Sequence, residues 1–339
     1  MKVRALVCAV SLIVACLVQP AGNPAWAQEA GKPAQGAKAA EAADPAAALF
    51  ANGWARHSAG NFQEAVRIYK EVSQKYPESD WAARALGCMG WDLTILRRND
   101  EAIEVWQRIL REYPDSKYGN GSPVAGQAAY SIAECLYAKA DVDQAMAALD
   151  QAVQLCPDAR GGENDGNLRS EMFLHMIENE DEQRAAAQAM EGGPPVNSPE
   201  YLYCRACHMK WDAALKSYQK LLNQYPRHRL AAAALANTAW TLSALGFYDE
   251  AIARYRKILD EYRDSLYLNG KPVAPRAAWS LACCYYVKGD MANAKKAFGF
   301  ALERYPDINV KGRLYGEVFL TLIKKVDAAV EKPEKGSGK

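Results

Sequence analysis

The sequence of 339 residues predicts an all-α fold. We expect an α-solenoid of six helical hairpins, arranged as two tandem-duplicated modules of three repeats, each closed by an extra helix. Two observations predict this fold. A long segment of the chain recurs at a constant offset, and a shorter unit with the periodicity of two amphipathic helices recurs inside each copy.

The long repeat has an offset of 149 residues. The Asp-Glu-Ala-Ile of residues 100–103 returns at 249–252, and the Asn-Gly of residues 120–121 returns at 269–270. Asn-Gly favours a turn with positive φ, so both copies are expected to turn at the same place. Separated matches at one offset indicate a tandem duplication.

The short unit has the pattern of two helices followed by a stop. Apolar residues recur at the i, i+3, i+4, i+7 spacing of one helix face, a polar turn follows, and a second apolar face ends at a proline, which cannot continue a helix. In the second unit these residues are Leu86, Met89, Gly90 and Leu93, then Ala102, Trp106, Ile109 and Leu110, with Pro114 as the stop. Small residues stand where the two helices must cross closely.

This unit resembles the tetratricopeptide repeat, which combines a small residue in the first helix, an alanine and an aromatic residue in the second, and a proline at the end. Six units carry the last three positions: Ala65, Tyr69, Pro77; Ala102, Trp106, Pro114; Ala145, Leu149, Pro157; Ala214, Tyr218, Pro226; Ala251, Tyr255, Arg263; Ala294, Phe298, Pro306. Leu149 and Arg263 depart from the pattern. The Tyr-Pro-x-Ser runs at 76–79 and 113–116 are similar to those of periplasmic members of the family.

The resemblance implies a non-enzymatic scaffold for protein–protein interaction in the bacterial cell envelope. In this family one face of each first helix lines a concave groove, which would bind an envelope protein or peptide. By register that partner groove includes Trp54, Trp91, Tyr130, Tyr137, Tyr203, Trp240, Trp279 and Tyr286. Aromatic residues with a polar end are favoured at binding surfaces, although the same rings could instead fill gaps between helices, or form a glycan-binding groove.

The N-terminus predicts a signal peptide over residues 1–27. Lys2 and Arg4 precede an apolar run too short to span a bilayer, and the small-x-small sequence at residues 25–27 predicts cleavage after Ala27. The mature protein is therefore expected to be periplasmic or secreted, with no integral membrane segment. An alternative is a lipobox at residues 13–16, which would leave a lipoprotein anchored through Cys16.

The other boundaries follow from composition and from the repeat. Residues 28–46 hold almost no large apolar side chains and are expected to be a disordered linker. Modules of three repeats plus a capping helix are expected at 47–191 and 199–328, separated by a Gly- and Pro-containing linker at 192–198, with a disordered tail at 329–339. The first capping helix carries an acidic stretch at 178–182, which predicts a solvated face.

One local motif points to a cofactor. Cys204, Cys207 and His208 have the C-x-x-C-H spacing of c-type haem attachment, in which two thiols bind the haem and the histidine binds its iron. The duplication places these residues at the end of a first helix, which favours plain helix packing. A monohaem protein, or a thiol-redox or disulfide pair of Cys204 and Cys207, remain the alternatives.

Nothing else in the sequence indicates catalysis, a metal or nucleic acid. No phosphate-binding loop, zinc-protease motif or nucleophile elbow is present, and the four histidines at 57, 175, 208 and 228 are scattered. Lysine and arginine number 41 against 40 acidic residues, and no basic patch is visible. Seven cysteines follow the signal peptide, so at least one is expected to lack an intrachain disulfide.

Overall fold

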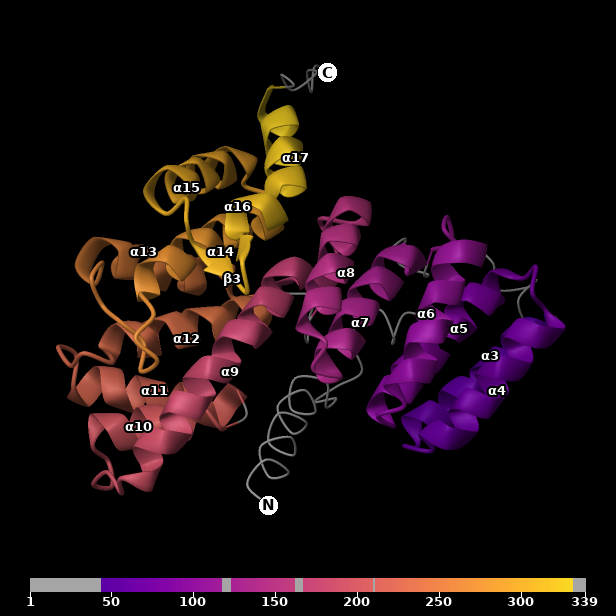
Figure 1. Ribbon diagram of the computed structural model, residues 1–339, viewed down its shortest axis with the longest axis horizontal. Helices are drawn as coiled ribbons and strands as arrows, with labels where there is room; N and C mark the ends of the chain where they lie inside the picture. The colour runs from indigo at the N-terminus through magenta and orange to yellow at the C-terminus, as the bar shows by residue number, and fades with distance from the viewer. Residues whose placement is uncertain (1–43, 118–122, 162–166, 210, 332–339) are drawn as a thin grey trace, which may run out of the picture. The chain divides into compact units, whose positions relative to one another are not determined.

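The computed structural model describes residues 44–117, 123–161, 167–209 and 211–331 (Figure 1). The expected signal peptide, with its alternative lipid site at Cys16, lies outside these residues. So do all but the last three residues of the expected linker and all but the first three of the expected tail. The first helix begins at Pro45, two residues before the expected boundary at 47.

The described residues form consecutive helix pairs. The first three pairs are α3 (Pro45–Ser58) with α4 (Phe62–Lys75), α5 (Asp80–Ile95) with α6 (Asn99–Glu112), and α7 (Val124–Ala138) with α8 (Val142–Leu155). The next three are α10 (Pro199–Ala206) with α11 (Trp211–Gln224), α12 (Ala231–Ala244) with α13 (Tyr248–Glu261), and α14 (Val273–Lys288) with α15 (Met291–Arg304). The expected all-α solenoid is confirmed.

The duplication is visible in the helix boundaries. The second helices α4, α6 and α8 begin and end 149 residues before α11, α13 and α15 respectively. The Asn-Gly turn in the second copy has Gly270 at a φ of +80°, as expected. The first copy of this turn lies outside the described residues.

The repeated side chains form the core of each pair. In all six units, the second-helix alanine and the large residue four positions later are at most 6% exposed. Gly90 shows why a small residue is needed in the first helix. A Cβ atom there would lie 2.5 Å from the Trp106 ring, closer than carbon atoms can approach.

Two tyrosines at equivalent positions near the ends of repeats connect successive pairs. The Tyr113 hydroxyl donates to the Pro77 carbonyl at 2.9 Å, and the Tyr262 hydroxyl donates to the Pro226 carbonyl at 3.1 Å. Arg263, which departs from the family pattern, donates from Nε to the Leu259 carbonyl at 2.6 Å. It therefore satisfies a carbonyl at the end of α13, where a cation is also favoured by the helix dipole.

Two short antiparallel hairpins were not predicted. Strand β1 (Arg160–Gly161) pairs with β2 (Asn167–Leu168), and β3 (Asn309–Val310) pairs with β4 (Arg313–Leu314). Two-residue strands are too short to give a period-two pattern in the sequence. Each hairpin follows the third pair of its copy.

The second copy ends in α16 (Tyr315–Val318) and α17 (Leu320–Glu331), and α17 packs against α15. Phe319 stacks on Trp279 with ring centroids 5.5 Å apart, and Leu322 and Val326 are buried. This agrees with the expectation of an extra helix that covers the end of the second module.

The expected boundary between the two modules is corrected. The chain divides into two compact units between Ala159 and Arg160, so α9 (Arg169–Glu191) belongs to the second unit and not to the first. The physical reason is that the buried polar side chains of α9 find their partners on α10, α12 and α14, as described below.

Candidate functional site

The face of the second module formed by its first helices holds α9. We define this first-helix face by Tyr203 of α10, Trp240 of α12, and Arg276, Ser280 and Cys283 of α14. The last three are spaced i, i+4 and i+7, which places them on one side of α14. The elements on both sides of the contact lie within the second unit.

Glu182 of α9 accepts three hydrogen bonds from the residues around it. Its carboxylate accepts from the Tyr203 hydroxyl at 2.7 Å and from the backbone N–H groups of Leu268 and Asn269, each at 2.9 Å. The side chain is only 2% exposed. Asn237 of α12 donates in turn to the Tyr203 hydroxyl at 3.3 Å. Three donors on one buried carboxylate make a strong, oriented contact.

His175 lies about two turns earlier on α9 and stacks on Trp240. The ring centroids are 3.7 Å apart and the planes differ by 14°. Arg276 donates to Nε2 of His175 at 3.2 Å. Because a guanidinium only donates, Nε2 is an acceptor and the imidazole is neutral with its proton on Nδ1. Within the described residues Nδ1 has no hydrogen-bond partner.

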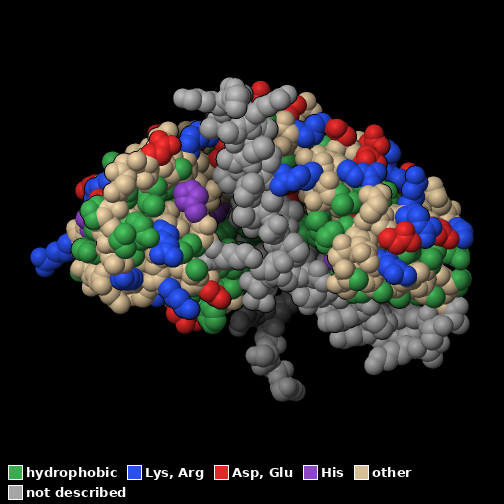
Figure 2. Space-filling model, turned by 90° about the horizontal axis from the view of Figure 1, so that it is seen from below, with side chains coloured by type: hydrophobic (Ala, Val, Ile, Leu, Met, Phe, Trp, Pro, Cys, Tyr) green, Lys and Arg blue, Asp and Glu red, His purple; other side chains and the backbone are tan. Residues whose placement is uncertain are grey.

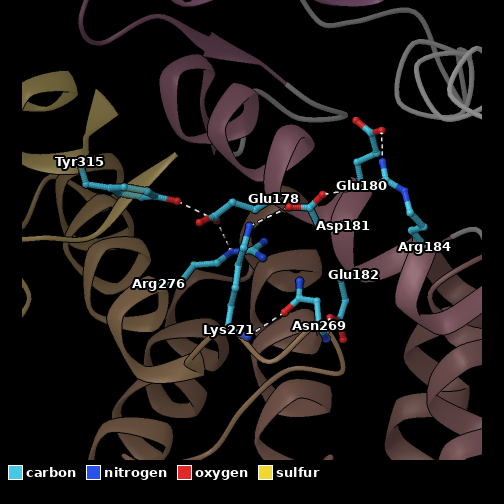
Figure 3. A network of polar contacts seen from close by, with 9 residues as sticks. All are labelled: Glu178, Glu180, Asp181, Glu182, Arg184, Asn269, Lys271, Arg276 and Tyr315. Carbon is cyan, nitrogen blue, oxygen red and sulfur yellow. Dashed lines mark hydrogen bonds and ion pairs between the residues drawn. The ribbon is translucent and has the colours of Figure 1, made fainter. Parts of the chain in front are cut away.

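Glu178 points toward Arg276 and Tyr315 (Figure 3). The Tyr315 hydroxyl donates to its carboxylate at 2.8 Å, and Nε of Arg276 lies 3.5 Å away. Burial raises the pKa of Glu178 to about 7, opposed by the hydrogen bond from Tyr315. Burial also lowers the pKa of Arg276.

Glu171 is a second buried carboxylate beside the same cation. Burial raises the pKa of Glu171 to about 7, while hydrogen bonds from Ser280 and Cys283 and the charge of Arg276 favour its ionised form. One carboxylate oxygen, Oε1, has no partner among the described residues. A single buried guanidinium therefore faces two carboxylates, which favours proton uptake by one of them near neutral pH.

The rim of this contact is more exposed. Lys271 donates to Asp181 of α9 at 2.9 Å, and its backbone N–H donates to the Asn269 side chain at 3.0 Å. A cavity of about 450 Å³ adjoins the cluster and is lined by Glu178, Lys271 and Arg304, among others. The lining carries both signs of charge, so it gives no preference for a ligand of one sign.

The prediction that the acidic stretch at 178–182 forms a solvent-exposed face is therefore wrong for part of that stretch. Glu178 and Glu182 are buried, whereas Glu180 is held at 2.8 Å by Arg184 on the same helix. The sequence contains a pattern that indicates this burial. Residues 171, 175, 178 and 182 follow the i, i+4, i+7, i+11 spacing of one helix face, so three carboxylates and an imidazole share it.

The aromatic residues expected to line a groove differ in how far they are buried. Tyr203 and Trp240 belong to the first-helix face but are covered by α9. Trp54, Trp91 and Tyr286 are half-buried and keep part of their surface accessible.

The remaining three aromatic residues are buried in the packing, which corrects their expected place in a groove. The Tyr130 hydroxyl donates to the Cys156 carbonyl at 3.2 Å. Trp279 packs between Phe298 and Phe319. Tyr137 is also buried.

The C-x-x-C-H residues do not fit haem attachment. Cys204 is fully buried, and Cys207 lies 3.5 Å from the Tyr218 hydroxyl. Burial raises the pKa of Cys204 to about 11 and the pKa of Cys207 to about 12. His208 is bound through Nδ1 to the Cys204 carbonyl at 2.9 Å. A macrocycle bonded to both sulfurs needs open space beside each, and the burial of Cys204 leaves none.

The thiol alternatives are also limited by the structure. The seven cysteines between residues 44 and 331 are all free thiols, so no Cys204–Cys207 disulfide is present there. Raised thiol pKa values disfavour the reactive thiolate. In the same part of the chain, no group of three or more histidine, cysteine or acidic side chains is placed to hold a metal.

Charged side chains of both signs lie at the surface of the described residues (Figure 2). On the side seen in Figure 2, basic and acidic side chains are interspersed. Ion pairs within one second helix include Arg67 with Glu64 and Arg108 with Glu112. Over the described residues, no helix combines the length and apolarity needed to cross a bilayer.

Comparison with known sequences and structures finds repeats of one kind. Two family profiles, each described as tetratricopeptide repeat, match residues 90–160 and 237–307, and residues 47–79 and 206–228. Together they cover more than half of the chain. No curated protein matches the sequence.

Among solved structures, the chain is similar to the TPR2AB domain of yeast Sti1 in complex with pHSP90, at 15% identity and a TM-score of 0.29. That match covers 85% of this chain and 98% of the other. A tetratricopeptide repeat protein from Parabacteroides merdae matches at 12% identity and a TM-score of 0.32, covering 83% and 98%. YrrB, described as a TPR protein with an unusual peptide-binding site, matches at 19% identity and a TM-score of 0.27, covering 64% and 88%.

Proposed function

The chain belongs to the tetratricopeptide repeat family, and from that premise we propose that it is a scaffold for protein–protein interaction in the bacterial cell envelope. Members of this family are typically non-enzymatic scaffolds. No cofactor takes part in the proposed function, and the partner is an envelope protein or a peptide segment of one.

One observation carries the proposal beyond the family. The first-helix face of the second module holds a helical segment, α9, through a ring stack and hydrogen bonds to buried carboxylates. A face that orients a helix by Trp240, Tyr203 and Arg276 has the kind of side chains that dominate protein interfaces. The first module keeps half-buried rings, Trp54 and Trp91, on its own first helices.

The envelope setting is supported by the sequence of residues 1–27. Its basic start, short apolar run and cleavage site after Ala27 are typical of exported proteins. Mass spectrometry of protein purified from the envelope should find a mature chain that begins at Gln28. A lipid-modified chain that begins at Cys16 would place the scaffold on a membrane surface instead.

Photo-crosslinking in living cells tests the scaffold function. A photoreactive amino acid replaces Trp91, and a matched control replaces Lys70, an exposed residue of the second helix α4. We expect a discrete crosslinked partner at position 91 and none at position 70. Equal crosslinking at the two positions, or none at either, would contradict the proposal.

A further inference from the structure

We propose that the first-helix face of the second module is a binding surface for an acidic amphipathic helix of a partner protein, and that α9 is the resident helix which this partner replaces. This inference rests on the proposed scaffold function. It adds the chemistry of the partner and the place where the partner binds.

α9 is not part of the repeats that it contacts. The family profiles match up to residue 160 and again from residue 206, so all of α9 lies outside them. The chain leaves α9 through Gly192 and Gly193, and Gly193 has a φ of +62°. The helix is thus a separate segment, joined to α10 by an irregular connection.

The donors of the face define what it binds. The Tyr203 hydroxyl and the backbone N–H groups of Leu268 and Asn269 converge on one carboxylate, and Arg276 with Tyr315 bind another. Buried donors without an acceptor cost free energy, so an occupant must supply anions at both places.

The sequence of α9 indicates how the side chains of a partner helix must be spaced. Carboxylates stand at positions i, i+7 and i+11, and a flat ring at i+4 stacks on Trp240. A partner helix with glutamates at these positions and histidine or an aromatic residue at i+4 reproduces every contact. A basic helix would bring positive charge against Arg276 and is excluded.

α9 fills this face imperfectly, and this makes its replacement feasible. Oε1 of Glu171 and Nδ1 of His175 are buried without partners in the described residues, and Glu171 and Glu178 share one guanidinium. Burying charges in excess of their partners offsets much of the attraction. A helix with a neutral side chain at the Glu171 position would bind the same face without that cost.

A peptide exchange experiment tests the proposal on the full mature chain. The probe is a synthetic peptide of residues 169–191 with an N-terminal fluorophore, and binding is followed by fluorescence anisotropy. In the wild-type chain the tethered α9 competes at high effective concentration, so the probe should bind weakly. Glu182→Ala in the chain weakens only the resident, and should raise the affinity for the probe at least tenfold.

Two controls are matched to this variant. Glu180→Ala changes the same helix two residues away, where the carboxylate bonds Arg184 and not the face, and should leave probe binding at the wild-type level. A probe peptide that itself carries Glu182→Ala should bind the Glu182→Ala chain without this increase in affinity. If circular dichroism shows that the Glu182→Ala chain has lost helix, Glu182→Gln serves in its place, because it keeps the volume and one acceptor.

The proposal is overturned if the Glu182 variant binds the probe no more tightly than the wild type. It is also overturned if both probes bind equally, or if Glu180→Ala gives the same gain. These outcomes leave the scaffold function standing, because crosslinking at position 91 in the first module tests it separately.

Discussion

Replacing Gly90 by alanine tests whether the crossing of α5 and α6 is packed as closely as the structure shows. The added Cβ atom would lie 2.5 Å from Cε2 and 2.7 Å from Cζ2 of Trp106. Carbon atoms in contact are normally about 3.5–4.0 Å apart, so the ring must move by roughly 1 Å. Trp106 is 0% exposed, so the ring would have to move within the core.

The expected magnitude is a difference of two terms. Overpacking a well-packed core costs about 1–3 kcal/mol, and replacing glycine within a helix gains about 0.5–1 kcal/mol. Gly90→Ala should therefore lower the free energy of unfolding by about 1 kcal/mol at the midpoints of these ranges, and by at most about 2.5 kcal/mol. Gly299→Ala is the matched control, because Gly299 lies in α15 with no atom within 4 Å of the added Cβ. It should gain about 0.5–1 kcal/mol.

The duplication supplies a rescue variant. At the positions equivalent to Gly90 and Trp106, the second copy has Ala239 and Tyr255. The smaller tyrosine accommodates the alanine, so Gly90→Ala combined with Trp106→Tyr should be more stable than the sum of the single changes predicts. Urea unfolding followed by circular dichroism measures all four proteins. An unchanged Gly90→Ala variant, or strictly additive effects, would refute the proposed packing.

Further predictions concern a buried carboxylate, an equivalent pair of tryptophans and the C-x-x-C-H residues. Burial raises the pKa of Glu171 to about 7, so the folded chain binds a proton on this carboxylate more tightly than the unfolded chain does. Protonation of Glu171 therefore stabilises the fold. The stabilisation is complete below about pH 4.3, the pKa of a free glutamate, and is lost as the pH rises through 7. Glu171→Gln should accordingly raise the free energy of unfolding at pH 8 by up to about 3 kcal/mol and change it little at pH 5; an equal effect at both pH values would contradict this. Trp240→Ala should cost about 3–5 kcal/mol in thermal melting, and Trp91→Ala, at the equivalent but half-buried position, should cost clearly less. Protein exported by a host able to attach haem should show no Soret band, and a thiol reagent should modify Cys207 faster than Cys204, because only Cys204 is fully buried.

The fold could be predicted because its determinants are local and repeated. An alanine such as Ala102 at the crossing, a large ring such as Trp106 four residues later and a stop such as Pro114 recur in six units. Each helix pair buries the same positions, so the pattern itself carries the packing. Even a departure such as Arg263 left the architecture unchanged, because a side-chain hydrogen bond to the end of α13 replaces the proline.

The position of α9 could not be predicted because it depends on tertiary partners. The helical spacing of residues 171, 175, 178 and 182 separates Glu182 from Glu180, but it does not show which of the two faces of α9 is buried. Only the structure shows that Glu182 meets three donors while Glu180 pairs with Arg184. The same reason limits prediction of the aromatic residues. Trp240 follows a groove pattern, and its burial results from His175, which lies 65 residues earlier in the chain.

The differences between the two copies bear most directly on function. Arg276, the cation that binds the carboxylates and His175 of α9, corresponds by the 149-residue offset to Gln127, whose amide instead donates to Ser131 at 3.5 Å. Cys283, which donates to Glu171, corresponds to Glu134. The first module thus has an amide and an acidic residue where the second has a guanidinium and a thiol. Because a buried carboxylate needs a cation or several donors, the first module cannot hold an acidic helix in the manner of the second. The duplication has kept one architecture, while the side chains on the first-helix faces of its two copies differ in charge.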